Sequence, residues 1–164
     1  MGSVGRVNTT KQNFPFSSRT RLLAAVALAS ILGVSGAQAS VRWATLEAIH
    51  QLENPRNRPT PGPCGELGPY QFREKTWRMH TTVPFARAID QRAADDVAVK
   101  HYEWLKRGLE GAGLPATPYN IALAWNGGLN AAVLGRAPAV ARDYAERAAN
   151  LAGTFGVERS AGGL

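Results

Sequence analysis

One glutamate stands out because of the residues that follow it in the chain. Glu53 closes an amphipathic stretch, and Gly65, Gly68 and Gln71 follow it in a glycine-rich segment. A second block, Ala-Leu-Ala-Trp-Asn-Gly-Gly, comes much later, at residues 122–128. A carboxylic acid facing such a loop can protonate a leaving oxygen, provided that it stays protonated near neutral pH. The pattern therefore indicates general acid chemistry, such as cleavage of a glycosidic bond.

Two features of the expected surroundings of Glu53 would raise the pKa of its carboxyl. The C-terminal end of a helix carries partial negative charge, which disfavours a carboxylate there. Leu52 and the apolar part of residues 122–128 would also remove water from the group. The alternative is a solvated glutamate at a helix end, which is the usual situation of a single glutamate.

The spacing of these residues resembles a known family. That family, the soluble lytic transglycosylase domain with its lysozyme-like fold, has a helix-ending Glu, an Asn-Pro-type loop, Gly-Ala-x-Gly-Leu-Met-Gln and a later Ala-x-x-Tyr-Asn-Ala-Gly. The matching positions are Glu53, Gly65, Gly68, Gln71 and residues 125–128. The resemblance spans about residues 43–135, and its combined motifs are more specific than any one of them.

The resemblance implies that the protein cleaves the β-1,4 bond between N-acetylmuramic acid and N-acetylglucosamine in peptidoglycan. Glu53 would act alone, first as the acid and then as the base toward the 6-hydroxyl of the same sugar, which gives a 1,6-anhydro product. The N-acetyl group of the sugar would stabilise the developing positive charge, as in other substrate-assisted glycosidases. No metal, cofactor or water is expected in the reaction.

The resemblance also implies a set of substrate-binding residues. Gln71 would hold the acetamido group or a backbone carbonyl, within the loop that contains Gly68. Asn126 would brace the loop that faces the acid. Tyr70 and Trp125 would offer aromatic faces for sugar stacking, and the alternative for each of them is packing in the core.

The chain departs from the family pattern at several positions. Asn54 replaces the usual Ser, residues 65–66 read Gly-Glu instead of Gly-Ala, and residues 69–70 read Pro-Tyr instead of Leu-Met. Trp125 replaces the tyrosine of the later motif, and a tryptophan has an N–H donor but no hydroxyl. We therefore expect the polar surroundings of the acid to differ from those in the family.

Glu66 leaves a second reaction open. Goose-type lysozymes, which are relatives of this family, carry a second acid after the first glutamate, and Glu66 would fill that place if it held a water molecule. The protein would then be a hydrolytic muramidase, and an inverting pair of carboxyls lies about 6.5–9.5 Å apart. The other interpretation of Glu66 is a solvated loop residue. A third possibility is a weakly active or inactive wall-binding accessory of an envelope-spanning secretion system.

The N-terminal residues have the three parts of a secretory signal peptide. The segment is basic and contains no acid, it has a short apolar run at residues 22–34, and it ends in Ala-Gln-Ala at residues 37–39. The apolar run is too short for a membrane-spanning helix of about 20 residues, although a retained anchor is the alternative. We expect cleavage after Ala39, export to the periplasm or the exterior, and no membrane span in the mature protein.

The remaining chain reads as one mostly α domain at residues 40–155, followed by a flexible tail at 156–164. We expect helices at residues 41–52, 72–80, 90–107, 118–126, 130–134 and 138–155. Four prolines between Asn54 and Gly68 predict an irregular loop that lines the cleft. Thr117 should cap a helix that has Pro118 at its first position.

Composition limits the classes of partner and cofactor. The net charge is +7, but the signal segment supplies Arg6, Lys11, Arg19 and Arg21, and no dense basic stripe suggests nucleic acid. Three scattered histidines without cysteine partners make a metal site improbable. Cys64 is the sole cysteine, so no internal disulfide can form. We expect a monomer whose partner is the peptidoglycan strand.

Overall fold

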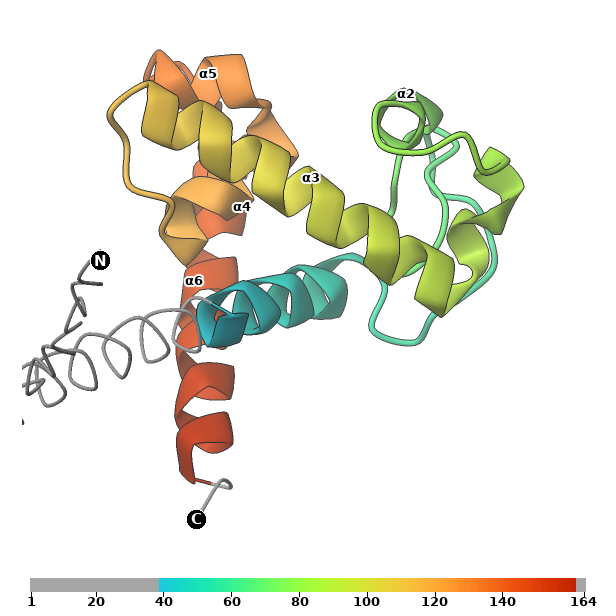
Figure 1. The fold of residues 1–164 in the computed structure, drawn as a ribbon, viewed down its shortest axis with the longest axis horizontal. Helices are drawn as coiled ribbons and strands as arrows, with labels where there is room; N and C mark the ends of the chain where they lie inside the picture. Colours follow the sequence, from blue (N-terminus) through green and yellow to red (C-terminus); the bar gives the residue numbers. More distant parts are fainter. Residues whose placement is uncertain (1–38, 162–164) are drawn as a thin grey trace, which may run out of the picture. The chain divides into compact units, whose positions relative to one another are not determined.

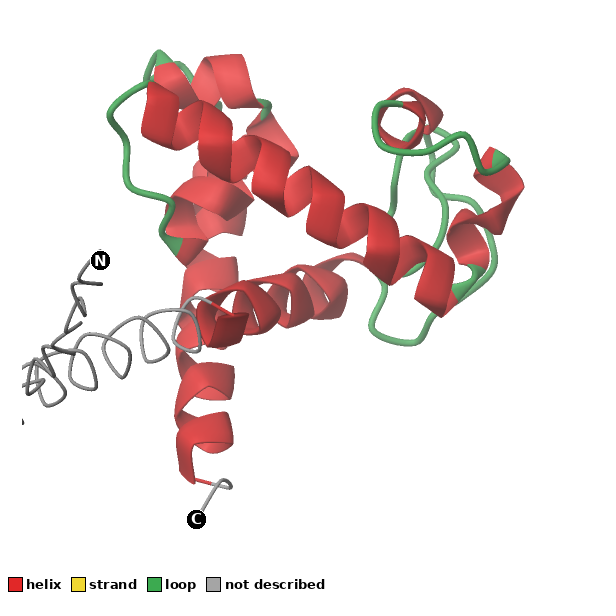
Figure 2. Ribbon diagram, in the orientation of Figure 1, coloured by secondary structure: helices red, strands yellow, loops and turns green. Residues whose placement is uncertain are grey.

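The structure, a computed structural model, describes residues 39–161, which are mostly helical (Figures 1 and 2). The prediction of a mostly α fold is confirmed, and the described part contains only one isolated bridge, between Leu67 and Phe72. The predicted signal peptide lies outside the described residues, apart from Ala39. The elements are a first helix at residues 39–53, α2 (Glu74–Arg78), the 3-10 helix η1 (Phe85–Ile89), α3 (Gln91–Gly111), α4 (Pro118–Gly127), α5 (Leu129–Val133) and α6 (Ala139–Ala161).

The first helix ends at Glu53, as the sequence predicts. Leu46 and Ile49 are buried on its inner face, and this burial stabilises the helix more than its intrinsic propensity does. The backbone N–H of Asn54 still bonds to the carbonyl of His50 at 3.0 Å, but Pro55 follows and favours extended backbone at the residue before it. The chain therefore turns away directly after the acid.

Residues 54–73 contain no helix and are held together by buried polar groups. The side chain of Asn54 is buried and accepts from the N–H of Arg58 at 2.9 Å, and it donates to the carbonyls of Arg58 and Gly68 at 2.9 and 3.2 Å. This side chain therefore ties the two ends of the loop to each other. A buried amide with these partners costs little, whereas the same amide without them would be destabilising.

The long helix α3 starts as expected but does not end at Gly108 as predicted. The carboxylate of Asp90 accepts from the N–H of Ala93 at 3.0 Å and caps the helix. The helix continues through Gly108 to Gly111. Burial of Leu105 and Leu109 outweighs the cost of a glycine inside a helix, which is about 1 kcal/mol. The glycine also makes room, because a Cβ at this position would lie 2.4 Å from Leu129 Cδ2.

The C-terminal half packs α4 against α6, and the two helices lie against each other in Figure 1. Thr117 Oγ1 accepts from the N–H of Asn120 at 3.2 Å with Pro118 at the first helical position, which confirms the predicted start of α4. The small residues Ala141, Ala145 and Ala148 are fully buried on α6 and allow this close approach.

Helix α6 is longer than predicted and continues to Ala161 rather than ending at Phe155. The ring of Phe155 meets the ring of Trp43 edge-on at 6.3 Å, and the guanidinium of Arg159 lies 4.7 Å from the centre of the same ring. These contacts with the first helix account for helical structure in the segment expected to be a tail. None of the helices between residues 39 and 161 is both long and apolar enough to cross a membrane.

Two smaller elements also differ from the predictions. The helix expected at residues 72–80 is shorter, because α2 covers only Glu74–Arg78. The 3-10 helix η1 was not predicted; Asp90 ends it and also begins α3. Trp77 of α2 is fully buried, and its indole N–H donates at 2.7 Å to the carbonyl of Val83, which lies between α2 and η1.

Candidate functional site

Glu53 lies where two cavities adjoin. The first, which we call the main cleft, has a volume of about 620 Å³ and is lined by the end of the first helix, the 54–73 loop, α3 and the end of α4. The second has a volume of about 530 Å³ and is lined by the first half of the loop. Glu53 and Gln71 line both cavities. The carboxyl of Glu53 is therefore next to both cavities.

The side chain of Glu53 is half-buried and has one hydrogen-bond partner among the described residues. Tyr144 from α6 donates its hydroxyl to Glu53 Oε1 at 2.8 Å. Burial raises the pKa of the Glu53 carboxyl above its usual value, the Tyr144 hydrogen bond opposes this, and the nearby charge of Glu66 raises it further. The net effect favours a protonated carboxyl, as a general acid requires.

Tyr144 is a candidate site residue that the sequence interpretation missed. It is 91 positions from Glu53 in the chain, so no local spacing connects the two. One feature could have pointed to it: Tyr144 lies among the alanines of the buried face of α6. The hydroxyl of a buried tyrosine usually needs a hydrogen-bond partner, and a carboxyl elsewhere in the chain could supply one.

The turn at residues 68–71 has a backbone conformation that positions Gln71. Gln71 has a φ of 46°, which is rare for a residue with a side chain, and Gly68 has a φ of 78°. The side-chain amide of Gln71 donates to the carbonyl of Gly68 at 2.9 Å. Such strained residues gather at functional sites. Gly68 itself lines neither cavity and contributes through this turn.

Trp125 and Asn126 both line the main cleft, at the end of α4. Trp125 is half-buried, and its ring lies 4.7 Å from that of His101 and 5.6 Å from that of Phe72. Asn126 is exposed in the cleft wall. Trp125 is thus partly a packing residue and partly available to a ligand.

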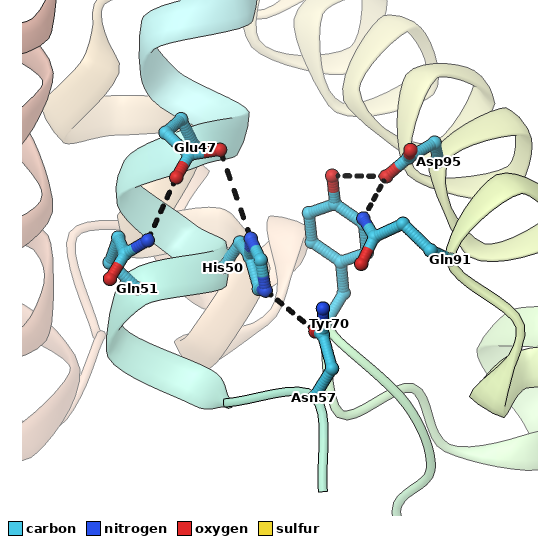
Figure 3. Close-up of polar contacts among 7 residues, drawn as sticks. All are labelled: Glu47, His50, Gln51, Asn57, Tyr70, Gln91 and Asp95. Carbon is cyan, nitrogen blue, oxygen red and sulfur yellow. Dashed lines mark hydrogen bonds and ion pairs between the residues drawn. The ribbon is translucent and has the colours of Figure 1, made fainter. Parts of the chain in front are cut away.

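Tyr70 does not line the main cleft, which corrects the expectation that it stacks on a sugar there. Its side chain is only 6% exposed, and its hydroxyl donates to Asp95 Oδ1 at 2.8 Å, a bond that Figure 3 shows beside the Gln91–Asp95 contact. Burial, together with the Asp95 carboxylate, raises the pKa of Tyr70. The residue joins the loop to α3 and belongs to the core.

Glu66 is in the main cleft but is not a freely solvated carboxylate. Its Oε2 accepts from the N–H of Cys64 at 2.9 Å, and its Oε1 accepts from the guanidinium of Arg73 at 3.1 Å. Its own backbone N–H, then the Cys64 N–H and the Arg73 charge, lower the pKa of Glu66. The residue is therefore an ionised anchor of the loop.

His101 forms part of the cleft wall and pairs with His80 behind it, and neither histidine was predicted as a feature of the site. His101 lines the main cleft, and its Nδ1 lies 2.9 Å from Nε2 of His80. Burial, with the neighbouring His80 as a smaller cause, lowers the pKa of His101 to about 3. The ring stacks on Trp104 at 5.7 Å. A neutral imidazole here supports Trp125 and carries no charge into the cleft.

Comparison with protein-family models, with curated proteins and with solved structures gave no match. Within residues 39–161, no cluster of three or more His, Cys, Asp or Glu side chains is arranged to hold a metal ion. The chemistry of the site must therefore be argued from its own residues.

Proposed function

We propose that this protein is a peptidoglycan lytic transglycosylase with a lysozyme-like fold, and that Glu53 is its single acid and base. The observation that carries the proposal is the Glu53 carboxyl itself, which has a raised pKa at the junction of two cavities. A glycan strand lying across the junction would place a glycosidic oxygen beside the acid. The motif spacing described above supports peptidoglycan as the glycan strand.

The contacts of Glu53 suggest a different role for each of its two carboxyl oxygens. Tyr144 donates to Oε1, which leaves Oε2 to carry the proton that is transferred to the leaving oxygen. The resulting carboxylate would then accept the proton of the sugar's 6-hydroxyl, which attacks the anomeric carbon and closes the anhydro ring. The Tyr144 hydroxyl would stabilise the carboxylate between these steps.

The other residues of the cleft would position the sugar. Gln71 lines both cavities and is held by Gly68, so it is placed to bond to an acetamido group next to the cleaved bond. The exposed face of Trp125 would stack on a sugar ring. Asn126 lies on the wall of the same cleft and would orient the adjacent residue of the strand.

A hydrolytic muramidase is the second candidate, because Glu66 is an ionised carboxylate in the same cleft. As a base it would have to hold a water molecule against the sugar. Both of its oxygens already accept hydrogen bonds, from Cys64 and from Arg73, which favours the role of a loop anchor. We therefore place this reaction second.

The proposed place of action is the periplasm or the exterior, where peptidoglycan is accessible, after removal of residues 1–39. In that setting the protein would open the wall as a monomer. The alternative is a wall-binding accessory of a secretion system without enzymatic activity. A measurement of turnover on peptidoglycan distinguishes this alternative from the proposal.

Substitution of Glu53 by Gln tests the proposal, because it keeps the shape of the side chain and removes the transferable proton. We expect the release of soluble muropeptides from purified peptidoglycan to fall by about 10² or more, the usual scale of general acid–base catalysis. Glu47→Gln is the matched control, since Glu47 lies on the same helix and lines neither cavity. Turnover of Glu53→Gln equal to that of the control would refute the assignment.

A further inference from the structure

The second cavity carries two arginines next to the acid. Its lining includes Arg56 and Arg58 together with Glu53 and Gln71, and we call it the arginine cavity. Among the described residues, no carboxylate forms an ion pair with either arginine, whereas Arg42, Arg73, Arg78 and Arg87 all have such partners. Both guanidinium groups are therefore available to a ligand.

The backbone that carries these arginines is held in one conformation. Asn54 bonds to both the N–H and the carbonyl of Arg58. Between the two arginines, Asn57 has a φ of 49°, and its side-chain oxygen lies 2.8 Å from His50 Nε2, a contact drawn in Figure 3. The loop thus presents Arg56 and Arg58 from a fixed backbone, which reduces the entropic cost of binding a ligand.

The two cavities differ in charge. In the main cleft, Arg73 is neutralised by Glu66 at 3.1 Å. In the arginine cavity, Glu53 is the only carboxyl among the described lining residues, and two arginines lie with it. A ligand that spans both cavities would therefore be oriented with its anionic part on the arginine side.

We infer that Arg56 and Arg58 bind a carboxylate carried on the lactyl side chain of muramic acid and so select the substituted sugar on that side of Glu53. This inference rests on the proposed function. The N-acetylated sugar rings of the strand are neutral, so only this side chain brings negative charge to the cavity, either as the lactyl acid itself or through the stem peptide attached to it. Guanidinium groups bind carboxylates with paired, directional hydrogen bonds.

Binding measurements on the full chain that carries Glu53→Gln test the inference without turnover. The double substitution Arg56→Gln, Arg58→Gln is added to it and compared with Arg92→Gln, Arg107→Gln. The control pair removes the same charge from exposed positions on α3 that line neither cavity. The three probes are soluble strands with stem peptides, strands stripped of peptides that keep lactyl carboxylates, and stripped strands with those carboxylates converted to amides.

We expect the Arg56→Gln, Arg58→Gln variant to bind a carboxylate-bearing strand about tenfold more weakly, the equivalent of about 1.4 kcal/mol. Binding of the amidated strand should not change, and the control pair should behave like Glu53→Gln alone. The loss should shrink at high salt, because exposed charges are screened. A loss confined to peptide-bearing strands identifies the stem peptide as the source of the carboxylate, a loss confined to stripped strands identifies the lactyl acid, and a loss on both shows that the arginines bind either carboxylate.

Three results would overturn the inference: equal binding by the arginine and control variants, an equal loss on the amidated strand, or no binding of any strand by the Glu53→Gln protein. Failure of the proposed function looks different. In that case the unsubstituted protein releases no muropeptides from peptidoglycan, while the effect of the arginines on binding is still measurable.

Discussion

Glu53 and Glu66 line one cleft, but their surroundings shift their pKa values in opposite directions. Glu53 is half-buried with one hydroxyl donor, whereas Glu66 has backbone N–H donors and a guanidinium. Two carboxyls whose pKa values are separated in this way can take different roles at one pH. At the scale of the residue, the structure thus distinguishes a carboxyl whose surroundings favour the protonated form from a carboxylate held ionised by its donors.

Tyr144→Phe should change the pH dependence of the reaction. The Tyr144 hydrogen bond lowers the pKa of Glu53, so its removal leaves the carboxylate less stabilised and raises that pKa further. We expect the fall of kcat/KM on the alkaline side, which reports deprotonation of the acid, to move to higher pH. The rate should drop by about tenfold for the loss of one hydrogen bond to a charged group.

Tyr102→Phe is the control for this change, because Tyr102 is also buried on a helix but lines neither cavity. The profile of muropeptide release against pH would be measured for both variants and for the unsubstituted protein. An unchanged alkaline limb in Tyr144→Phe would contradict the role assigned to its hydroxyl.

Glu53→Gln should also stabilise the protein at neutral pH. Because the folded state raises the pKa of Glu53 above about 4.5, ionisation of this group costs stability as the pH rises through and beyond that value. A difference of one in pKa corresponds to about 1.4 kcal/mol. We expect a higher Tm for Glu53→Gln at pH 7 and a difference that disappears toward pH 4. A lower Tm for Glu53→Gln than for the unsubstituted protein at pH 7 would contradict the claim that ionised Glu53 destabilises the folded state.

At the scale of the element, the glycine of the 68–71 turn tests how the loop is built. A Cβ at Gly68 would lie 1.7 Å from the carbonyl oxygen of Ala88, whereas a Cβ at Gly113 would meet nothing within 4 Å. The two residues have nearly equal φ values, 78° and 77°. The matched pair therefore separates steric overlap from backbone preference.

We expect Gly113→Ala to lower the free energy of unfolding by about 1–2 kcal/mol, the cost of a left-handed conformation for a residue with a side chain. Gly68→Ala should lower it by about 4 kcal/mol or more, the range of the most damaging substitutions. Urea unfolding followed by circular dichroism gives both values. Equal losses would show that the loop moves away from Ala88 without cost.

The local elements could be predicted from sequence where a single residue has a strong conformational preference. Thr117 with Pro118 marks the start of α4, and Asp90 marks the start of α3. Gly108 misled the prediction, because its effect depends on Leu129, which approaches it from another helix. Tertiary contacts of this kind outweigh a local preference of about 1 kcal/mol.

At the scale of the whole molecule, the candidate site could be predicted only in part. The motif positions Glu53, Gln71, Trp125 and Asn126 do line one cleft. Tyr70 was misplaced, since its neighbour in sequence, Gln71, turns to the cleft while Tyr70 turns to Asp95. Tyr144 was missed because its partner is distant in the chain. Both errors depend on packing between helices, which residue spacing does not specify.

The two cavities on either side of Glu53 also bear on how a strand would be cut. On the proposed function, the two adjoining cavities would hold sugars on both sides of the cleaved bond, whether the strand is cut at its end or within its length. The distribution of product lengths early in a digest would report this directly.

The mass of the products most directly tests the central claim that Glu53 works alone. Purified peptidoglycan would be digested in ¹⁸O-labelled water and the muropeptides analysed by mass spectrometry. We predict 1,6-anhydro ends, each one water lighter than a hydrolysis product and free of label, because the attacking oxygen belongs to the sugar. Reducing muramic acid ends that carry the label would contradict the account and assign the reaction to Glu53 with a water held by Glu66.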